Sequence, residues 1–331
     1  MYEEAFGLSH KPFSMSADPR FLYLTPQHRE AATGLIYSVL KHKGMATLTG
    51  EAGTGKTTVL RAVLTAMSAA SVKVSYVPVP TLTPAEFLEF ILLQFGLLNL
   101  ARANKAERLL LFERFLLSSQ EKNQTSLLIV DEAHKLSKEL LEEIRLLTNF
   151  DTRAGMLLQI VLAGQSELDE LLRESDLGQF KQRIAYRFSL HGLTGDEVEA
   201  YIAHRWSRAG GSPAPPFDAE AIRHIALYSG GIPRLINAIC DNTLVMAFAD
   251  NAPVVTAAGV HEAARDLDLV RDERLVPVGT NGNGGGGMSE LELLALASSA
   301  VRGAGLPALE RKDSPRKESW LVRSARRLLS G

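Results

Sequence analysis

Short apolar and β-branched runs alternate with longer helical patterns from about residue 46 to residue 191. Runs of this length and composition predict strands, and they read MATLTG, VKVSYVPV, SLLIVDE, LLQIVLAG and RFSLHGL. The runs MATLTG and SLLIVDE, which precede a glycine-rich turn and a pair of acids, are apolar on both faces, as buried parallel strands are. The alternation of strands and helices predicts an α/β fold with a doubly wound parallel sheet.

The regions on either side of this core have different patterns. Residues 1–44 predict an irregular lead followed by a helix, with Thr25 as its N-cap and Pro26 at its first position. After residue 193 the strand patterns stop, and four helical segments follow as far as residue 270. We therefore expect a lead with one helix (1–44), an α/β core (45–193) and a small all-α lid domain (194–270).

The last part of the chain predicts a linker and a basic tail. Residues 271–301 include six glycines between positions 278 and 290 and predict a flexible linker followed by a short helix. Residues 302–331 hold eight Lys or Arg against three Asp or Glu. Leu321, Ala325 and Leu328 share a helical stripe, which suits an amphipathic helix on an anionic membrane or a partner. A partly disordered basic tail explains the same residues equally well.

Composition narrows the class of protein without naming an activity. Of the 331 residues, 46% are hydrophobic and 22% are charged, which is typical of a globular protein rather than a disordered or fibrous one. Cys240 is the single cysteine, so an internal disulfide framework and a cysteine-ligated metal site are excluded. The chain has neither a secretory pattern at its start nor an apolar run of ~18 residues, so we expect a cytoplasmic protein.

The glycine-rich turn GEAGTGKTT fits the phosphate-loop pattern G-x-x-x-x-G-K-[ST] between a predicted strand and a predicted helix. Its glycines let the backbone curl with N–H groups directed at phosphates. Lys56 supplies charge to the β- and γ-phosphates, and Thr57 offers a hydroxyl to Mg²⁺. The predicted ATP-binding residues are Gly50, Glu51, Ala52, Gly53, Thr54, Gly55, Lys56, Thr57 and Thr58.

A second motif, SLLIVDEAH, places two acids at the carboxyl end of a buried strand. Ligands of open α/β sheets bind at that edge. Asp131 is expected to hold Mg²⁺ through water, and Glu132 is expected to orient and deprotonate the attacking water. Together the two motifs predict a magnesium-dependent ATPase.

Four further residues are candidates for sensing or stabilising the γ-phosphate. Gln165 follows the fourth predicted strand, where a polar group can contact the γ-phosphate or the attacking water. Arg234 begins a lid helix and can couple the angle of the lid to the nucleotide. Arg183 and Arg187 precede or open the last strand, where an arginine from one subunit can complete the site of its neighbour. The sequence does not choose between these two arginines.

With these residues in view, the chain resembles the AAA+ ATPases, and among them the ExeA/GspA-like group of the general (type II) secretion pathway. The resemblance covers residues 1 to about 269 and rests on the lead, the phosphate loop, LLIVDEAHKLS, IVLAGQSEL and SGGIPRLIN. It implies that Asp131 and Glu132 are the Walker B pair, Gln165 is sensor one and Arg234 is sensor two. It also implies that the lead helps to close the adenine pocket.

The resemblance narrows the activity more than the partner. One hypothesis is a homo-oligomeric motor or switch for a secretion or polysaccharide-export assembly of the cell envelope, peripheral at the inner membrane through its tail. The alternative is a DNA-dependent ATPase of the TniB-like transposition type, with DNA contacts that weaken as salt rises. A nucleotide-dependent scaffold that hydrolyses little is a third, against which Glu132 argues. Larger GspA-like proteins add a transmembrane helix and a peptidoglycan-binding domain, and we expect neither from this sequence.

Overall fold

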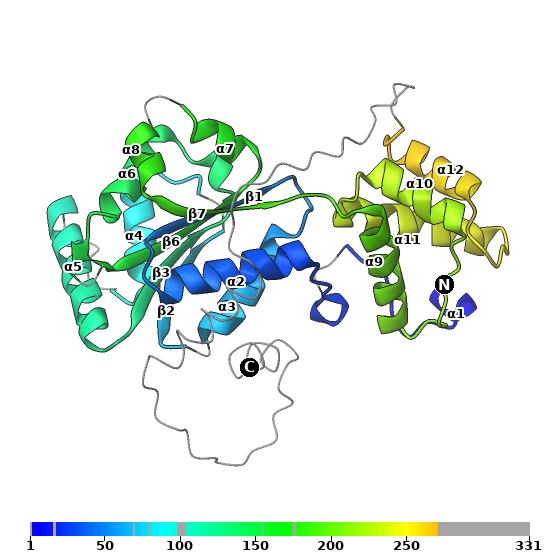
Figure 1. The fold of residues 1–331 in the computed structure, drawn as a ribbon, viewed down its shortest axis with the longest axis horizontal. Helices are drawn as coiled ribbons and strands as arrows, with labels where there is room; N and C mark the ends of the chain where they lie inside the picture. Colours follow the sequence, from blue (N-terminus) through cyan, green and yellow to red (C-terminus); the bar gives the residue numbers. More distant parts are fainter. Residues whose placement is uncertain are drawn as a thin grey trace, which may run out of the picture. The chain divides into compact units, whose positions relative to one another are not determined.

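The computed structural model describes residues 2–15, 18–68, 70–78, 80–97, 104–153, 155–174 and 177–270. They divide into two units, drawn in Figure 1. The sheet unit comprises residues 27–51 and 59–190, and the lid unit comprises the described parts of 2–26, 52–58 and 191–270. The predicted linker and basic tail, residues 271–331, lie outside the described residues.

The helices and strands follow one another in the predicted α/β order. Up to the second motif they are α1 (Tyr2–Ala5), η1 (Pro19–Phe21), α2 (Pro26–Leu40), β1 (Met45–Gly50), α3 (Lys56–Ser68), β2 (Val72–Val77), α4 (Pro84–Gln94), α5 (Lys105–Glu121) and β3 (Thr125–Val130). The remaining elements of the sheet unit are η3 (Ala133–Lys135), α6 (Lys138–Leu147), β4 (Asp151–Thr152), β5 (Gly155–Met156), β6 (Leu158–Gly164), α7 (Glu167–Leu171), α8 (Gly178–Gln182) and β7 (Ile184–Leu190).

The sheet has the order β2-β3-β6-β1-β7, and every pairing in it is parallel. All five predicted strands are present, so the doubly wound α/β prediction is confirmed. β1, β3 and β6 are buried at every residue because they have a strand on each side and helices on both faces. β2 and β7 are the edge strands, and their burial alternates. A two-stranded hairpin of β4 and β5, which was not predicted from the sequence, precedes β6.

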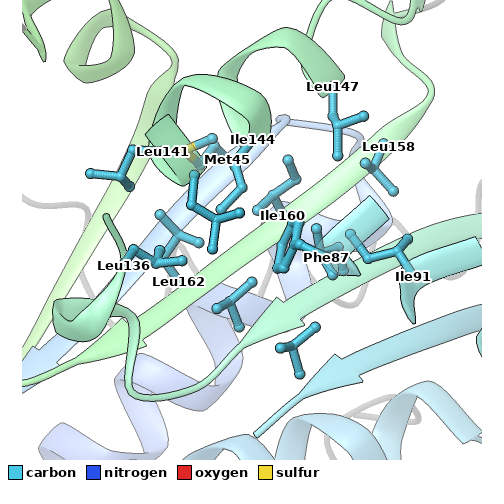
Figure 2. Packing of buried hydrophobic residues seen from close by; sticks show 14 of the residues in the cluster. Met45, Phe87, Ile91, Leu136, Leu141, Ile144, Leu147, Leu158, Ile160 and Leu162 are labelled. Carbon is cyan, nitrogen blue, oxygen red and sulfur yellow. The ribbon is translucent and has the colours of Figure 1, made fainter. Parts of the chain in front are cut away.

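Alternate residues of the central strands enter two separate apolar cores. Leu128 and Val130 of β3 face a core covered by α4, α5, α6, α7 and α8, whereas Leu127 and Ile129 face one covered by α2 and α3. Figure 2 shows part of the first core, in which the labelled leucines and isoleucine of α6 pack over the apolar side chains of β6. Burial on both faces fixes the register of β3, because a shift by one residue would exchange the two sets.

The lid unit is built around helices α9 (Gly195–Arg208), α10 (Ala219–Ser229), α11 (Pro233–Ala249) and α12 (Ala257–Asp266). Thr194 caps α9 through the backbone N–H of Glu197, in a reciprocal capping box, and Asp218 caps α10 through that of Ala221. Thr256 occupies the N-cap position of α12 but makes no side-chain capping bond.

The amino-terminal lead packs in the core of the lid unit. Tyr2, Leu8, Phe13 and Phe21 are buried there with apolar residues of α9, α10 and α11. Buried Arg205 of α9 donates from Nε to the carbonyl oxygen of Pro12 over 2.6 Å, and its guanidinium lies over the Phe21 ring. Lead and lid are thus one packed body, although 193 residues separate Arg205 from Pro12. Among the described helices, none is long and apolar enough to cross a membrane.

Candidate functional site: the carboxyl edge of the sheet

Three neighbouring strands end together and bring Asp131, Glu132 and Gln165 to one edge of the sheet. Thr49 of β1 lies opposite Gly164 of β6, and Val130 of β3 lies opposite Leu162 of β6. Because the strands are parallel, the residues that follow them leave the sheet at its carboxyl edge. The phosphate loop starts there after β1, Asp131 and Glu132 follow β3, and Gln165 follows β6.

The backbone of the phosphate loop has the conformation that its glycines suggest. Gly50, Gly53 and Gly55 have φ values of 152°, 86° and 105°, a region in which a side chain is strained. Lys56 begins α3 and is 7% exposed, whereas the adjacent Thr57 is exposed. Thr54 is buried, Thr58 is half-buried, and Glu51 and Ala52 are exposed. The loop therefore presents a helix N-terminus with a buried lysine and an accessible hydroxyl, a combination suited to phosphate and a metal ion.

Within the lid unit, the phosphate loop packs against the start of α11. A Cβ atom on Gly53 would lie 2.7 Å from Cβ of Arg234 and 3.1 Å from Cγ2 of Ile232. Position 53 therefore excludes a side chain by close approach as well as by its positive φ. Arg234 itself is exposed in the first turn of α11. The structure thus brings the predicted sensor arginine next to the loop.

Both carboxylate oxygens of Asp131 are held. Oδ1 accepts from the backbone N–H of Glu132 over 2.9 Å, and Oδ2 accepts from the phenol of Tyr76 over 2.8 Å. Burial and then this hydrogen bond raise the pKa of Tyr76 well above its usual range, so the phenol keeps the proton that it donates. Asp131 is buried. The aspartate is fixed in one orientation and retains lone pairs for a metal or its water.

Glu132 lies in a sharp turn between β3 and η3. Its φ of 52° is in the left-handed region, which is uncommon for a residue other than glycine and marks strain held by its surroundings. Oε2 lies 3.5 Å from Nε2 of His134 and 3.5 Å from Nζ of Lys135. The side chain is half-buried, so it can reach water while two basic groups restrict it.

Gln165 contacts His134 twice. Its backbone N–H donates to Nδ1 of His134 over 3.2 Å, and its side-chain nitrogen lies 3.2 Å from Nε2 of the same ring. A Cβ atom on Gly164 would lie 2.9 Å from the backbone nitrogen of His134, so glycine at the end of β6 permits this approach. Glu132, His134 and Gln165 consequently form one contiguous set.

Neither arginine proposed to act in trans lies at the carboxyl edge of the sheet. Arg183 precedes β7, whose first residue pairs with Met45 at the start of β1, and it donates to Oδ1 of Asn149 over 3.0 Å. Arg187 pairs with Thr47 in the middle of β1 and is exposed on the edge strand. A role for either residue in the site of a neighbouring subunit stays a prediction.

Two residues of this edge, Tyr76 and His134, were not predicted from the sequence. His134 had a visible signal, since it stands two positions after Glu132 in a turn too short to carry it far away. Tyr76 had a weaker one, as a tyrosine near the carboxyl end of a strand. That β2 would lie beside β3 is a matter of sheet order, which the sequence did not specify.

The fold and this edge define a P-loop protein of the AAA+ class. Residues 39–172 match the family model described as AAA domain. This chain is 40% identical to the general secretion pathway protein A of Aeromonas hydrophila over 276 residues, which are 82% of the chain. The resemblance to the GspA-like AAA+ ATPases is therefore confirmed. The chain matches only 50% of the length of that relative.

Solved structures show the same fold at low sequence identity. Cdc6p of Pyrobaculum aerophilum matches with a TM-score of 0.59 and 18% identity, over 77% of this chain and 70% of its own. A Drosophila ORC structure bound to DNA matches with a TM-score of 0.57 and 19% identity, over 78% and 64%. The Aeropyrum pernix ORC2 protein, in ADPNP-ADP complexes, matches with a TM-score of 0.52 and 17% identity, over 89% of this chain and 79% of its own. At such identities the likeness concerns the fold.

Proposed function

We propose that this protein binds and hydrolyses Mg–ATP, and that the cycle drives a motor or switch in a secretion or polysaccharide-export assembly of the cell envelope. The observation that carries the ATPase proposal is the convergence of Asp131, Glu132 and Gln165 on the sheet edge where the phosphate loop begins. The nucleotide held by ORC2 of Aeropyrum pernix supports it.

The residues divide the chemistry among them. Backbone N–H groups of residues 50–58 and the Lys56 ammonium would bind the phosphates, while Thr57 and Asp131 would hold Mg²⁺. When bound there, Mg²⁺ would supply charge neutralisation for the transferred phosphoryl group. Glu132 would orient the attacking water and accept its proton, and Gln165 would contact the γ-phosphate. Arg234 would report the nucleotide state to the lid through its place beside Gly53.

The pathway proposal rests on the secretion relative. Identity of 40% over most of this chain supports a shared role at the envelope, carried out from the cytoplasmic side and peripheral to the inner membrane. A homo-oligomer would allow Arg183 or Arg187 to complete the site of a neighbour. DNA dependence of the TniB-like kind is the alternative that the test must separate. The Drosophila ORC structure bound to DNA shares only the fold with this chain.

The test is the steady-state ATPase rate of the full chain at fixed salt, alone, with duplex DNA and with anionic liposomes. Lys56→Ala is the blank, because it removes the phosphate-binding charge. Liposome stimulation that disappears when residues 302–331 are deleted supports the envelope proposal. Stimulation by DNA alone overturns it in favour of the alternative, and a wild-type rate equal to the blank under all conditions contradicts the ATPase proposal itself.

A further inference from the structure

His134 touches both the proposed base and the proposed γ-phosphate sensor. Its Nε2 lies 3.5 Å from Oε2 of Glu132, and its two ring nitrogens contact the backbone and side chain of Gln165. The side chain is 12% exposed, and its backbone lies against Gly164. The imidazole is therefore a fixed link between the ends of β3 and β6.

The contacts determine which ring nitrogen of a neutral His134 carries the proton. Nδ1 accepts the backbone N–H of Gln165, so it holds no proton, and the neutral ring must carry its proton on Nε2. Nε2–H can then donate to Glu132 or to Gln165. Two N–H groups cannot pair with each other, so the carboxamide atom of Gln165 that lies 3.2 Å from Nε2 is assigned as the oxygen instead of the nitrogen.

This arrangement has a consequence for the carboxamide of Gln165. When its oxygen accepts from His134, its NH₂ group is directed to the other side and keeps its donor hydrogens for another acceptor. The γ-phosphate supplies anionic oxygens that only a donor can recognise. A carboxamide turned the other way would present its oxygen to the phosphate and repel it.

We propose that His134 is a positioning residue that sets the Gln165 carboxamide with its NH₂ group toward the γ-phosphate and restrains Glu132 at the same time. The proposal rests on the ATPase function above and adds a coupling between sensor and base. His134 acts through these two side chains and needs no contact with the nucleotide. Loss of its Nε2–H donor should therefore weaken discrimination of ATP from ADP as well as hydrolysis.

The experiment is a double-mutant cycle with His134→Ala, Gln165→Ala and the double variant in the full chain. Turnover is measured at saturating Mg–ATP, and calorimetry gives the affinities for Mg–ADP and for a non-hydrolysable ATP analogue. His42→Ala is the matched control, since His42 contacts Thr125 at the start of β3, the opposite end of the strand from Asp131. Melting temperatures confirm that the variants fold.

Two conservative variants separate the ring nitrogens. In His134→Gln the side-chain NH₂ group can donate from the position of Nε2–H. In His134→Asn the shorter side chain can place its amide oxygen as an acceptor at the position of Nδ1. The proposal requires the Nε2–H donor, so His134→Gln should keep more turnover and more preference for the ATP analogue over ADP than His134→Asn. The reverse order contradicts the proposal.

We expect either single alanine variant to lower turnover about 10- to 100-fold and to reduce the preference for the ATP analogue, with the double variant no worse than the poorer single one. His42→Ala should match the wild type. If the two alanine substitutions had additive effects on turnover, or if His134→Ala kept the wild-type preference for the ATP analogue over ADP, the role of His134 would be overturned. The proposed function would still stand in that case, provided that the wild-type chain hydrolyses ATP. A wild-type chain that bound no nucleotide would overturn both.

Discussion

Different kinds of interaction stabilise the interior of the sheet unit and the interior of the lid unit. The sheet unit is stabilised by two apolar cores, to which β3 contributes alternate side chains. The candidate catalytic residues Asp131, Glu132 and Gln165 follow the ends of its strands. The lid unit has an apolar core too, but its lead is fastened by buried polar contacts from Arg205 and by the hydrogen bond of Tyr2 to Asp241. Burial, followed by this hydrogen bond, raises the pKa of Tyr2 above its usual range.

The difference shows where each unit is vulnerable. Removing a methylene from the sheet unit opens a cavity whose cost depends on local relaxation. Removing Arg205 leaves the carbonyl of Pro12 and the hydroxyl of Tyr201 without a donor in a buried setting. We therefore expect polar substitutions in the lead and in α9–α12 to affect mainly stability, and those in the phosphate loop and at the carboxyl edge of the sheet to affect mainly nucleotide binding and chemistry.

The largest effect on stability is expected from Arg205→Ala. Loss of two buried hydrogen bonds and of the packing over Phe21 should lower the free energy of unfolding by about 3 kcal/mol. Chemical denaturation measures it, and limited proteolysis should show cleavage in residues 2–25 first. Arg208→Ala, in the same helix, is the control, because its bond to the Arg20 carbonyl is exposed. Equal destabilisation by both would remove the distinction between the units.

Lys56→Ala should come next, with an effect on binding rather than on folding. A charge-assisted contact to phosphate contributes about 2 to 3 kcal/mol, so affinity for Mg–ATP should fall roughly 30- to 150-fold. Titration calorimetry gives the affinity. Lys73 is an exposed lysine of β2 that lies over the Phe115 ring, so the control variant Lys73→Ala should bind ATP as the wild type does. A loss of affinity in both variants would indicate a non-specific charge effect.

Gly164→Ala tests the contact between β6 and η3. The new Cβ would lie 2.9 Å from the backbone nitrogen of His134, and relief of that clash should cost about 1 to 2 kcal/mol and lower turnover more than affinity. Gly178→Ala in α8 has open space around the added carbon and should be neutral. Measuring turnover and melting temperature for both variants checks the prediction. Wild-type turnover in Gly164→Ala would show that the geometry of η3 does not matter for chemistry.

Tyr76→Phe should have the smallest effect. It removes one hydrogen bond to the Asp131 carboxylate, worth about 1 kcal/mol, and should raise the Mg²⁺ concentration needed for half-maximal turnover several-fold. Tyr186→Phe is the comparison, since Tyr186 stacks on Phe188 in β7. If the two variants had the same magnesium dependence, Tyr76 would have no role in holding the aspartate.

Patterns along the chain predicted much of the sheet unit, because burial on both faces leaves continuous apolar runs. The apolar runs at β1, β3 and β6 predicted these strands, and the motifs after β1 and β3 indicated the carboxyl edge of the sheet. Caps that act within four residues, such as Thr194, were also predictable. Contacts over long separations were not: neither the bond of Arg205 to Pro12 nor the place of Tyr76 beside Asp131 has a local signature.

The most direct test of the account is single-turnover cleavage of Mg–ATP by the wild type and by Glu132→Gln, with binding measured in parallel. Glu132 is proposed to act as the base, so the glutamine variant should bind Mg–ATP within a few-fold of the wild type. It should cleave ATP about 100- to 10,000-fold more slowly, the usual contribution of a positioned general base. Cleavage by Glu132→Gln at the wild-type rate would contradict the account, because the chemistry would then not depend on the acid at the end of β3.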